Sequence, residues 1–225
     1  MGVAIMAAGT DAAAYSNNYI PPVASPLVWG NLESSAIPES RRSKNWGSAG
    51  GNFSLSGNAA FSSVGVSAAA GVDSRLTLGT FSPDAYTMIG LVDVGVSAGI
   101  MRHRDIRLTT SADKKLGRSM TAGSVVSDIV LPASGAFVVF LQGDLTGHVF
   151  GMATRNSVTA ATASTAVNTG TSSTFLGGSN ASSAFAAWSG YGVALYPRKL
   201  SNAEIMLVAE RLLKRAAYLG VTVNG

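Results

Sequence analysis

The chain has 225 residues and a net charge of +4, and 47% of its residues are hydrophobic whereas only 12% are charged. This length is enough for one large all-β domain or two small ones, with room for a buried core. The sequence contains no cysteine, which excludes disulfides, thiolate zinc sites and thiol nucleophiles.

Residues 1–26 predict an extended arm ahead of a domain that we place at 27–225. Alanine-rich and polar pieces alternate in the arm without sustained periodicity, and a cluster of prolines near its end favours an extended path. A folded monomer gains little from such a segment. Its apolar start, Val3, Ile5 and Met6, therefore favours docking on a neighbouring subunit, with an unattached terminus as the alternative.

From Leu27 onward, short apolar or alternating runs are interrupted by Gly, Ser, Asn and Pro. Many strands at regular spacing, with no helical pattern between them, predict a β-sandwich and not a parallel sheet. The runs richest in β-branched and aromatic residues are the most strand-like. The predicted strands are 52–56, 59–66, 74–79, 86–95, 99–109, 125–130, 136–142, 147–154, 157–162, 173–177 and 190–196.

One helix is predicted, at about 202–217. Ser201 is placed as its N-cap, and Glu204 is placed to reach back to the cap in a capping box. Leu200 and Ile205 are spaced to form a hydrophobic staple, and an apolar stripe with 3- and 4-residue spacing follows. We expect this helix to cover an edge or end of the sandwich, where it would limit unwanted strand pairing.

Two C-terminal segments and two N-terminal segments carry a family resemblance. A Leu-Gly-Gly strand, a Gly-bounded strand ending in Tyr and a Leu-Ser-x-x-Glu-Ile helix start are typical of the end of a laminin-G-like domain with the concanavalin A-like jelly-roll fold. A Trp strand and a Trp-x-x-x-Gly-Gly turn resemble its opening in many bacterial and phage proteins. Together the four segments cover about a third of the chain: "FLGGSN" (175–180), "WSGYGVALYPRKLSNAEI" (188–205), "PLVWGNLESS" (26–35) and "NWGSAGGNFSLSGNAAF" (45–61).

The resemblance implies an all-β, concanavalin A-like jelly-roll sandwich with an N-terminal arm and a C-terminal helix. In such a sandwich the last strand returns through the sheet, and we expect Gly190 and Gly192 to permit its close packing.

Acidic residues do not form the pattern of a glycosidase. Enzymes with this sandwich, such as the β-glucanases, use a carboxylate pair on one strand of the concave face, about 5 Å apart when configuration is retained. No predicted strand carries such a pair, so we expect no enzyme activity. The acids considered are Glu33 and Glu39 in an early loop, Glu204 and Glu210 on the helix, and Asp93 and Asp105 as isolated strand residues.

The sequence also offers few candidate metal ligands. His103 lies between two arginines, which disfavour both an imidazolium and a metal cation, and His148 alternates with apolar residues on a predicted strand. Laminin-G-like domains sometimes bind calcium through loop oxygens, and "QGDLTG" (142–147) offers Asp144. Calcium requires six or more oxygens. We therefore favour a turn there and expect no cofactor.

Carbohydrate binding would use an aromatic platform flanked by amides or acids. The candidates are Trp46, Trp188 and Tyr191, with Asn45 and Asn180 near them in sequence. A tryptophan beside a glycine turn can instead fill the core of a sandwich. Exposed aromatic rings in a concave site would favour a glycan, whereas buried Trp46 and Trp188 would oppose it.

The sequence favours a non-enzymatic structural protein of a tailed-bacteriophage virion, either a head decoration or a tail or fibre component. It would be made in the host cytoplasm and would assemble through its arm, as a homo-oligomer such as a trimer. The alternative is a lectin-like module that binds a bacterial surface glycan. Dispersed basic residues and the lack of about 18 consecutive apolar residues predict neither nucleic-acid binding nor membrane insertion.

Overall fold

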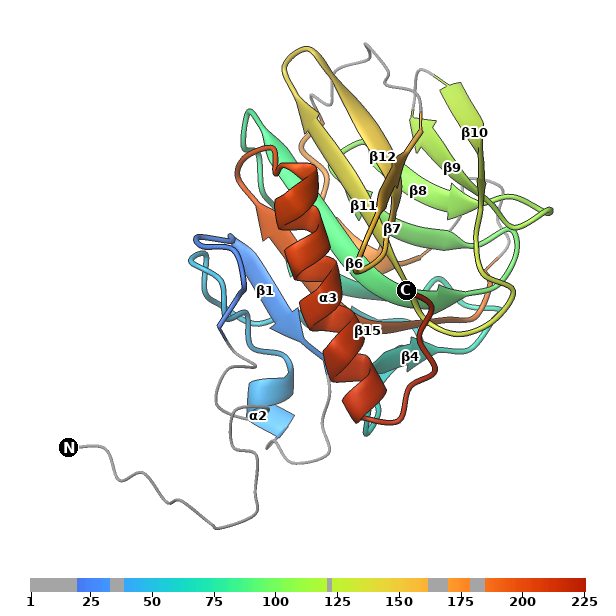
Figure 1. The fold of residues 1–225 in the computed structure, drawn as a ribbon. Helices are drawn as coiled ribbons and strands as arrows, with labels where there is room; N and C mark the ends of the chain where they lie inside the picture. Colours follow the sequence, from blue (N-terminus) through green and yellow to red (C-terminus); the bar gives the residue numbers. More distant parts are fainter. Residues whose placement is uncertain (1–19, 33–38, 121–122, 162–169, 179–184) are drawn as a thin grey trace.

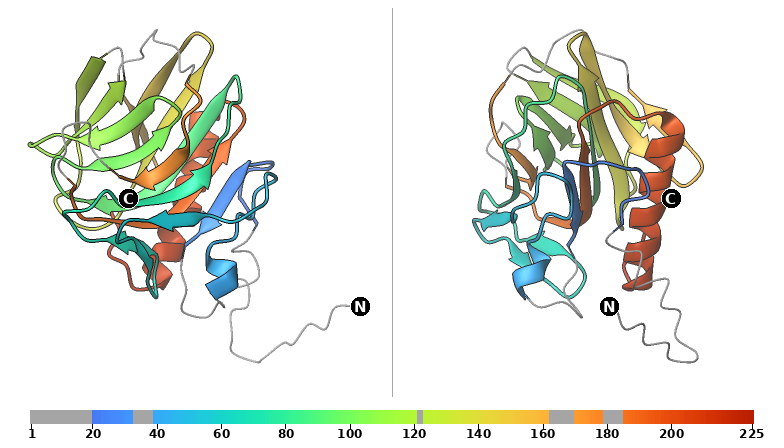
Figure 2. Two further views of the ribbon diagram at one scale, coloured as in Figure 1. Left: turned by 180° about the vertical axis from the view of Figure 1, so that it is seen from behind. Right: turned by 90° about the vertical axis from the view of Figure 1, so that its left-hand side faces the viewer.

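The computed structural model describes residues 20–32, 39–120, 123–161, 170–178 and 185–225. Over these ranges the chain forms two antiparallel β-sheets that pack face to face, and one long helix lies against the outer surface of the first sheet (Figure 1, Figure 2). The predicted all-β sandwich with a C-terminal helix is confirmed. The arm residues Val3, Ile5 and Met6 lie outside the described residues, so their role stays a prediction.

The first sheet has eight strands, and its central strands are almost completely buried because both faces are covered. The spatial order is β13, β12, β11, β6, β15, β4 and β3, while β1 pairs with β15 only. The bounds are β1 (Val28–Asn31), β3 (Ala60–Phe61), β4 (Val66–Ala68), β6 (Tyr86–Val94), β11 (Phe137–Asp144), β12 (Gly147–Ala153), β13 (Val158–Ala160) and β15 (Trp188–Tyr196).

The second sheet has seven strands in the spatial order β10, β9, β8, β7, β14, β5 and β2. Thus β10 forms one edge of this sheet, as β13 does for the first sheet. The bounds are β2 (Ser54–Ser56), β5 (Arg75–Gly79), β7 (Gly99–His103), β8 (Ile106–Thr110), β9 (Lys115–Met120), β10 (Gly123–Val130) and β14 (Thr174–Gly177).

The core between the sheets is apolar and closely packed around Trp188. The indole Nε1 donates a hydrogen bond to the Ser74 carbonyl at 2.9 Å, so the ring's polar atom is satisfied inside the core. Gly177 has a φ of +73°, and a Cβ there would lie 2.0 Å from the Trp188 ring. Gly177, the first glycine of the Leu-Gly-Gly sequence, is therefore required both by backbone conformation and by the tryptophan.

A second apolar cluster fills the space between the first sheet and α3 (Asn202–Tyr218). The helix contributes Ile205, Val208 and Leu212 to this cluster, which confirms the predicted stripe. The Ser201 hydroxyl accepts a hydrogen bond from the Glu204 amide, and the Glu204 carboxylate accepts one from the Ser201 amide. The predicted capping box is thus confirmed. No helix among the described residues is long and apolar enough to cross a membrane.

The position of the helix differs from the prediction. It contacts β6, β11, β12, β13 and β15, so it covers the outer face of the first sheet and not an edge or end of the sandwich (Figure 1). Of the two glycines expected to permit close packing, Gly192 does so, since a Cβ there would lie 2.6 Å from Leu212 Cδ2. At Gly190 the nearest atom would lie at an ordinary 3.4 Å, so that part of the expectation was wrong.

The predicted strand 99–109 is in fact a hairpin of β7 and β8. Arg104 turns the chain with a φ of +56°, and Asp105 lies in the turn and is not a strand residue. A left-handed conformation is uncommon for a residue other than Gly, Asn or Asp, so the sequence gives little warning of this turn. Within the predicted strand 59–66, only Ala60–Phe61 (β3) and the first residue of β4, Val66, are in strands. Strand β9 and the short helix α2 (Glu39–Arg42) were not predicted.

Candidate functional site

The predicted aromatic platform does not form as one surface. Trp188 is 4% exposed and points into the core between the sheets, whereas Tyr191 packs on the helix side of the same strand. A bulge in β15 separates them, because Gly190 and Gly192 pair with the adjacent residues Val92 and Leu91 and Tyr191 is the extra residue. Asn180 lies outside the described residues.

Trp46 is half-buried and packs against the helix-side cluster, with the Lys44 ammonium 4.4 Å from the centre of its ring. The neighbouring Asn45 is buried, and its side chain forms hydrogen bonds with backbone groups. Its amide oxygen accepts from the amides of Trp29 (3.0 Å) and Gly47 (2.9 Å), and its NH₂ donates to the carbonyls of Leu27 and Gly50. Asn45 therefore holds the Trp-x-x-x-Gly-Gly turn against β1.

A row of polar side chains crosses three adjacent strands of the first sheet. Ser189 on β15 is paired with Ser67 on β4 and with Asp93 on β6, and all three line a shallow hollow of about 370 Å³. Tyr191 joins this row through a side-chain hydrogen bond with Ser189. Burial raises the pKa of the Tyr191 phenol, the bond with Ser189 opposes that rise, and the charge of Asp93 adds to it. We call Ser67, Asp93, Ser189 and Tyr191 the polar row.

The polar row combines hydroxyls, a carboxylate and a half-buried ring. This arrangement can form hydrogen bonds and one stacking contact with a polyhydroxylated ligand. Tyr191 was a predicted ligand residue, and Asp93 had been considered only as an isolated acid. Ser67 and Ser189 were missed because serines that are distant in sequence show no pattern before the strand register is known.

Both histidines are buried inside the sandwich, at 0% exposure for His103 and 3% for His148. His103 Nδ1 lies 2.9 Å from the Thr174 hydroxyl, and its ring centre lies 4.3 Å from that of Tyr86. Burial, assisted by the positive charge of Arg104, lowers the pKa of His103 to about 3. The imidazole is therefore a neutral core group at physiological pH.

The acidic residues of the described chain are mostly engaged in local contacts. Glu204 serves the helix cap and pairs with Arg198, and Glu210 pairs with Lys214 at 2.6 Å. Asp144 Oδ1 accepts from both the amide (2.7 Å) and the hydroxyl (2.6 Å) of Thr146, and Lys199 lies 3.0 Å from Oδ2. These contacts, led by the Thr146 hydroxyl, lower the pKa of Asp144.

Within the described ranges, no cluster of three or more His, Cys, Asp or Glu side chains could hold a metal ion. At the calcium candidate, Asp144 forms part of the tight β11–β12 turn, and the Lys199 ammonium beside it opposes a second cation. Glu33 lies outside the described residues.

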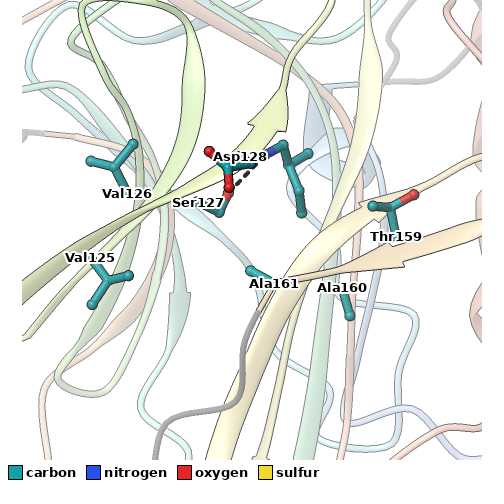
Figure 3. A pocket seen from close by; sticks show the side chains of 8 residues that line it. Val125, Val126, Ser127, Asp128, Thr159, Ala160 and Ala161 are labelled. Atoms are coloured by element: carbon teal, nitrogen blue, oxygen red, sulfur yellow. Dashed lines mark hydrogen bonds between the residues drawn. The ribbon is translucent and has the colours of Figure 1, made fainter.

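A second hollow lies between the edges of the two sheets. It has a volume of about 410 Å³ and is lined by β10 on one side and by β13 and Ala161 on the other (Figure 3). We call it the edge groove. The lining residues are Val125, Val126, Ser127, Asp128, Ile129, Thr159, Ala160 and Ala161. The sequence predicted strands here, but it did not show that these two edges lie across a groove from each other.

No protein-family model and no curated protein sequence matches this chain. Among solved structures, one concerning the ganglioside-dependent cell entry of botulinum neurotoxin type C aligns with a TM-score of 0.60 at 8% identity, over 84% of this chain and 51% of that one. The binding domain of botulinum neurotoxin serotype C1 aligns with a TM-score of 0.57 at 8% identity, over 84% and 52%.

A mutant Trypanosoma rangeli sialidase with trans-sialidase activity aligns with a TM-score of 0.53 at 14% identity, over 82% of this chain and 32% of that one. This chain thus spans about half the length of the toxin chains and about a third of the sialidase. At such low identities the likeness establishes the β-sandwich fold, and function must be argued from the sites.

Proposed function

We propose that this chain is a non-enzymatic structural protein of the virion of a tailed bacteriophage, as a head decoration or as a tail or fibre component. It acts through protein–protein assembly, after synthesis in the cytoplasm of the host bacterium. The resemblance of its terminal segments to laminin-G-like domains of bacterial and phage proteins supports this proposal, as does a charged fraction of only 12%.

The observation that carries the proposal is the exposure of large apolar side chains at two separate places. One is Ile20, in the C-terminal part of the arm, which is 60% exposed. The other is the outer edge of β10, where Val126 is 57% and Val130 is 61% exposed. Apolar surface of this kind on an edge strand is typical of contacts with another chain.

The proposed assembly device is the arm, residues 1–26, which docks on a neighbouring subunit through Val3, Ile5 and Met6. The partners are other copies of the chain, with a trimer as the first arrangement to test, and other virion proteins. The test is the mass in solution of the full chain beside a chain that lacks residues 1–22. An oligomer that dissociates on truncation supports the proposal, and a monomeric full chain contradicts it.

A second candidate function is lectin-like binding of a bacterial surface glycan. The polar row favours it, because Ser67, Asp93 and Ser189 line one hollow of the first sheet and the Tyr191 side chain adjoins Ser189. The aligned toxin structure described by its interaction with ganglioside molecules is consistent with a fold that can carry such a site. Buried Trp188 takes no part in this candidate.

The glycan candidate predicts that Tyr191→Ala weakens binding to any glycan found on an array by at least tenfold, through the loss of one stacking contact and one hydroxyl. Asp93→Asn should weaken the same binding. Tyr218→Ala is the matched control, since Tyr218 is 58% exposed on α3, outside the polar row. An array without a hit, or equal losses in all three variants, would exclude the polar row as a glycan site.

A further inference from the structure

The edge groove is bounded by two strands that each end a sheet. β10 pairs with β9 on one side and β13 pairs with β12 on one side, and neither has a further strand partner among the described residues. The groove between them has room for an extended segment, at about 410 Å³. Its walls come from both sheets (Figure 3), so a chain lying in it would close the open side of the sandwich.

The part of β10 from Gly123 to Val126 lacks the features that usually protect an edge strand, which on β10 begin only with Asp128 and the register shift after Val126. Natural edges carry lysine or proline or are very short, whereas β10 is eight residues long and contains neither of these residues. Val125 and Val126 are 45% and 57% exposed. Among the described residues that line the groove, Asp128 alone is charged, and it is paired with Lys115 at 3.4 Å.

The regular part of β10 is short. Its pairing with β9 is in register from Gly123 to Val126 and then shifts before Val130, which marks an irregularity in the strand. A partner strand that extends the sheet can therefore pair with about four residues. It should be apolar and uncharged, because the groove offers valines, isoleucine and alanines.

The arm has a segment that fits these requirements. Residues 3–6, Val-Ala-Ile-Met, are apolar and uncharged, and the first charged side chain of the sequence is Asp11. The described chain begins beside β1, on the opposite side of the molecule from β10 (Figure 1, Figure 2). Ile20 also lies against α3, since its carbonyl accepts a hydrogen bond from Arg211 Nη1 at 3.4 Å, and α3 contacts β13.

Chain length allows two destinations for the arm. Residues 7–19 connect the apolar segment to Ile20 and can span at most about 45 Å when fully extended. A compact domain of this size has a radius of gyration of about 17 Å, so the segment can reach the edge groove of its own chain across α3 or the edge groove of an adjacent copy. The assembly role proposed for the arm favours the adjacent copy.

We propose that the edge groove receives residues 3–6 of a second copy of this chain, which pair with Gly123–Val126 of β10 as an added strand. This inference rests on the proposed function, since it identifies where the assembly arm docks. The added strand satisfies the outward backbone groups of β10, and its apolar side chains cover Val125 and Val126.

Cross-linking between separate chains tests the docking site directly. Because the sequence has no cysteine, Ile5→Cys in one full-length chain and Val126→Cys in another place a single thiol on each. After the two chains are mixed and oxidised, we expect the Ile5–Val126 disulfide at least tenfold more often than one with the control Val72→Cys. Val72 is 48% exposed and lies outside the groove.

A charge in the groove provides an independent measurement. Val126→Lys should weaken self-association of the full chain at least tenfold, with the melting temperature of the dissociated chain unchanged. Leu207→Lys is the matched control, at 48% exposure on α3, and should leave association unchanged.

The outcomes separate this inference from the proposed function. Suppose that the oligomer depends on the arm, but that Ile5→Cys cross-links to Val126→Cys no more than to Val72→Cys and Val126→Lys does not weaken association. This result overturns docking in the edge groove but still supports assembly through the arm. A doubly substituted chain, Ile5→Cys with Val126→Cys, that closes its disulfide within a monomer overturns exchange between copies. A full chain that is monomeric at all concentrations overturns both.

Discussion

Tyr191 shows how one extra residue in a strand changes which face of the sheet the following side chains occupy. In a regular strand, residues five apart point to opposite faces, but Trp188 and Val193 both lie in the core between the sheets. The bulge adds one residue, so that Tyr191 and Gly192 both face the helix side and Val193 faces the core between the sheets, as Trp188 does. A strict alternation of side chains between the two faces, assumed from the sequence, therefore assigns the faces correctly on one side of the bulge and wrongly on the other.

The prediction grouped Trp188 and Tyr191 as one platform because both residue types suit sugar binding and because residues close in sequence are expected to be close in space. Type and spacing do not reveal a bulge, whose position depends on the pairing with β6. Among the predicted ligand residues that the structure describes, only Tyr191 lies in the polar row, and Trp46 is placed by its contacts with Lys44 and the helix-side cluster.

His103 makes stability depend on pH. Its pKa falls from the ordinary 6.5 to about 3 in the folded chain, first through burial and second through Arg104. The neutral imidazole's contribution is complete above pH 6.5, the unfolded value. It is lost as the pH falls toward 3, because the unfolded chain binds the proton and the folded chain does not. One such group contributes a slope of at most about 1.4 kcal/mol per pH unit.

We therefore expect the free energy of unfolding in urea to fall between pH 6.5 and pH 3 and to be insensitive to this group above pH 7. His103→Gln removes the titrating group and should flatten the pH dependence, even if it lowers stability at every pH. The comparison needs unfolding curves of both proteins at several values across this window. Equal slopes for the two proteins would show that His103 does not remain neutral in the folded state.

At the scale of elements, the helix could be predicted almost completely because its signals are local. Ser201, Glu204 and the apolar stripe act within one or two turns, so they do not depend on the rest of the fold. By contrast, β9 (Lys115–Met120) has a glycine and two basic residues and little β propensity. It is a strand because β8 and β10 pair with it on both sides.

Ser201→Ala tests the cap. The change removes the hydroxyl oxygen that accepts a hydrogen bond from the Glu204 amide nitrogen, 3.3 Å away, and we expect it to lower the free energy of unfolding by about 1 kcal/mol. Ser201→Thr keeps a capping oxygen and should retain most of that stability. Coincident denaturation curves for Ser201→Ala and the unsubstituted chain would mean that the hydroxyl does not stabilise the helix.

At the scale of the whole molecule, the sequence predicted the fold class better than the sites. A sandwich follows from many short strands with turn residues between them, which are features of each segment taken alone. The polar row requires Ser67, Asp93 and Ser189 to align across three strands, and the edge groove requires the ends of two sheets to face each other. Both depend on long-range pairing, which a single sequence does not reveal.

The long helix covers the first sheet because that sheet is apolar on its outer face as well as on its inner face. Its central strands expose apolar side chains on both faces, one toward the second sheet and one toward α3. Val23, which immediately follows the prolines near the end of the arm, is buried in the helix-side cluster. Removal of residues 1–22 should therefore spare both cores and leave cooperative unfolding intact, which a thermal melt checks.

The most direct test of assembly through the arm is the mass of the purified protein in solution, measured by light scattering for the full chain and for the chain without residues 1–22. We predict that the full chain is a stable oligomer and that the truncated chain is a folded monomer, because the domain keeps its cores while the edge groove loses its occupant. Two monomers, or two oligomers of equal size, would contradict assembly through the arm.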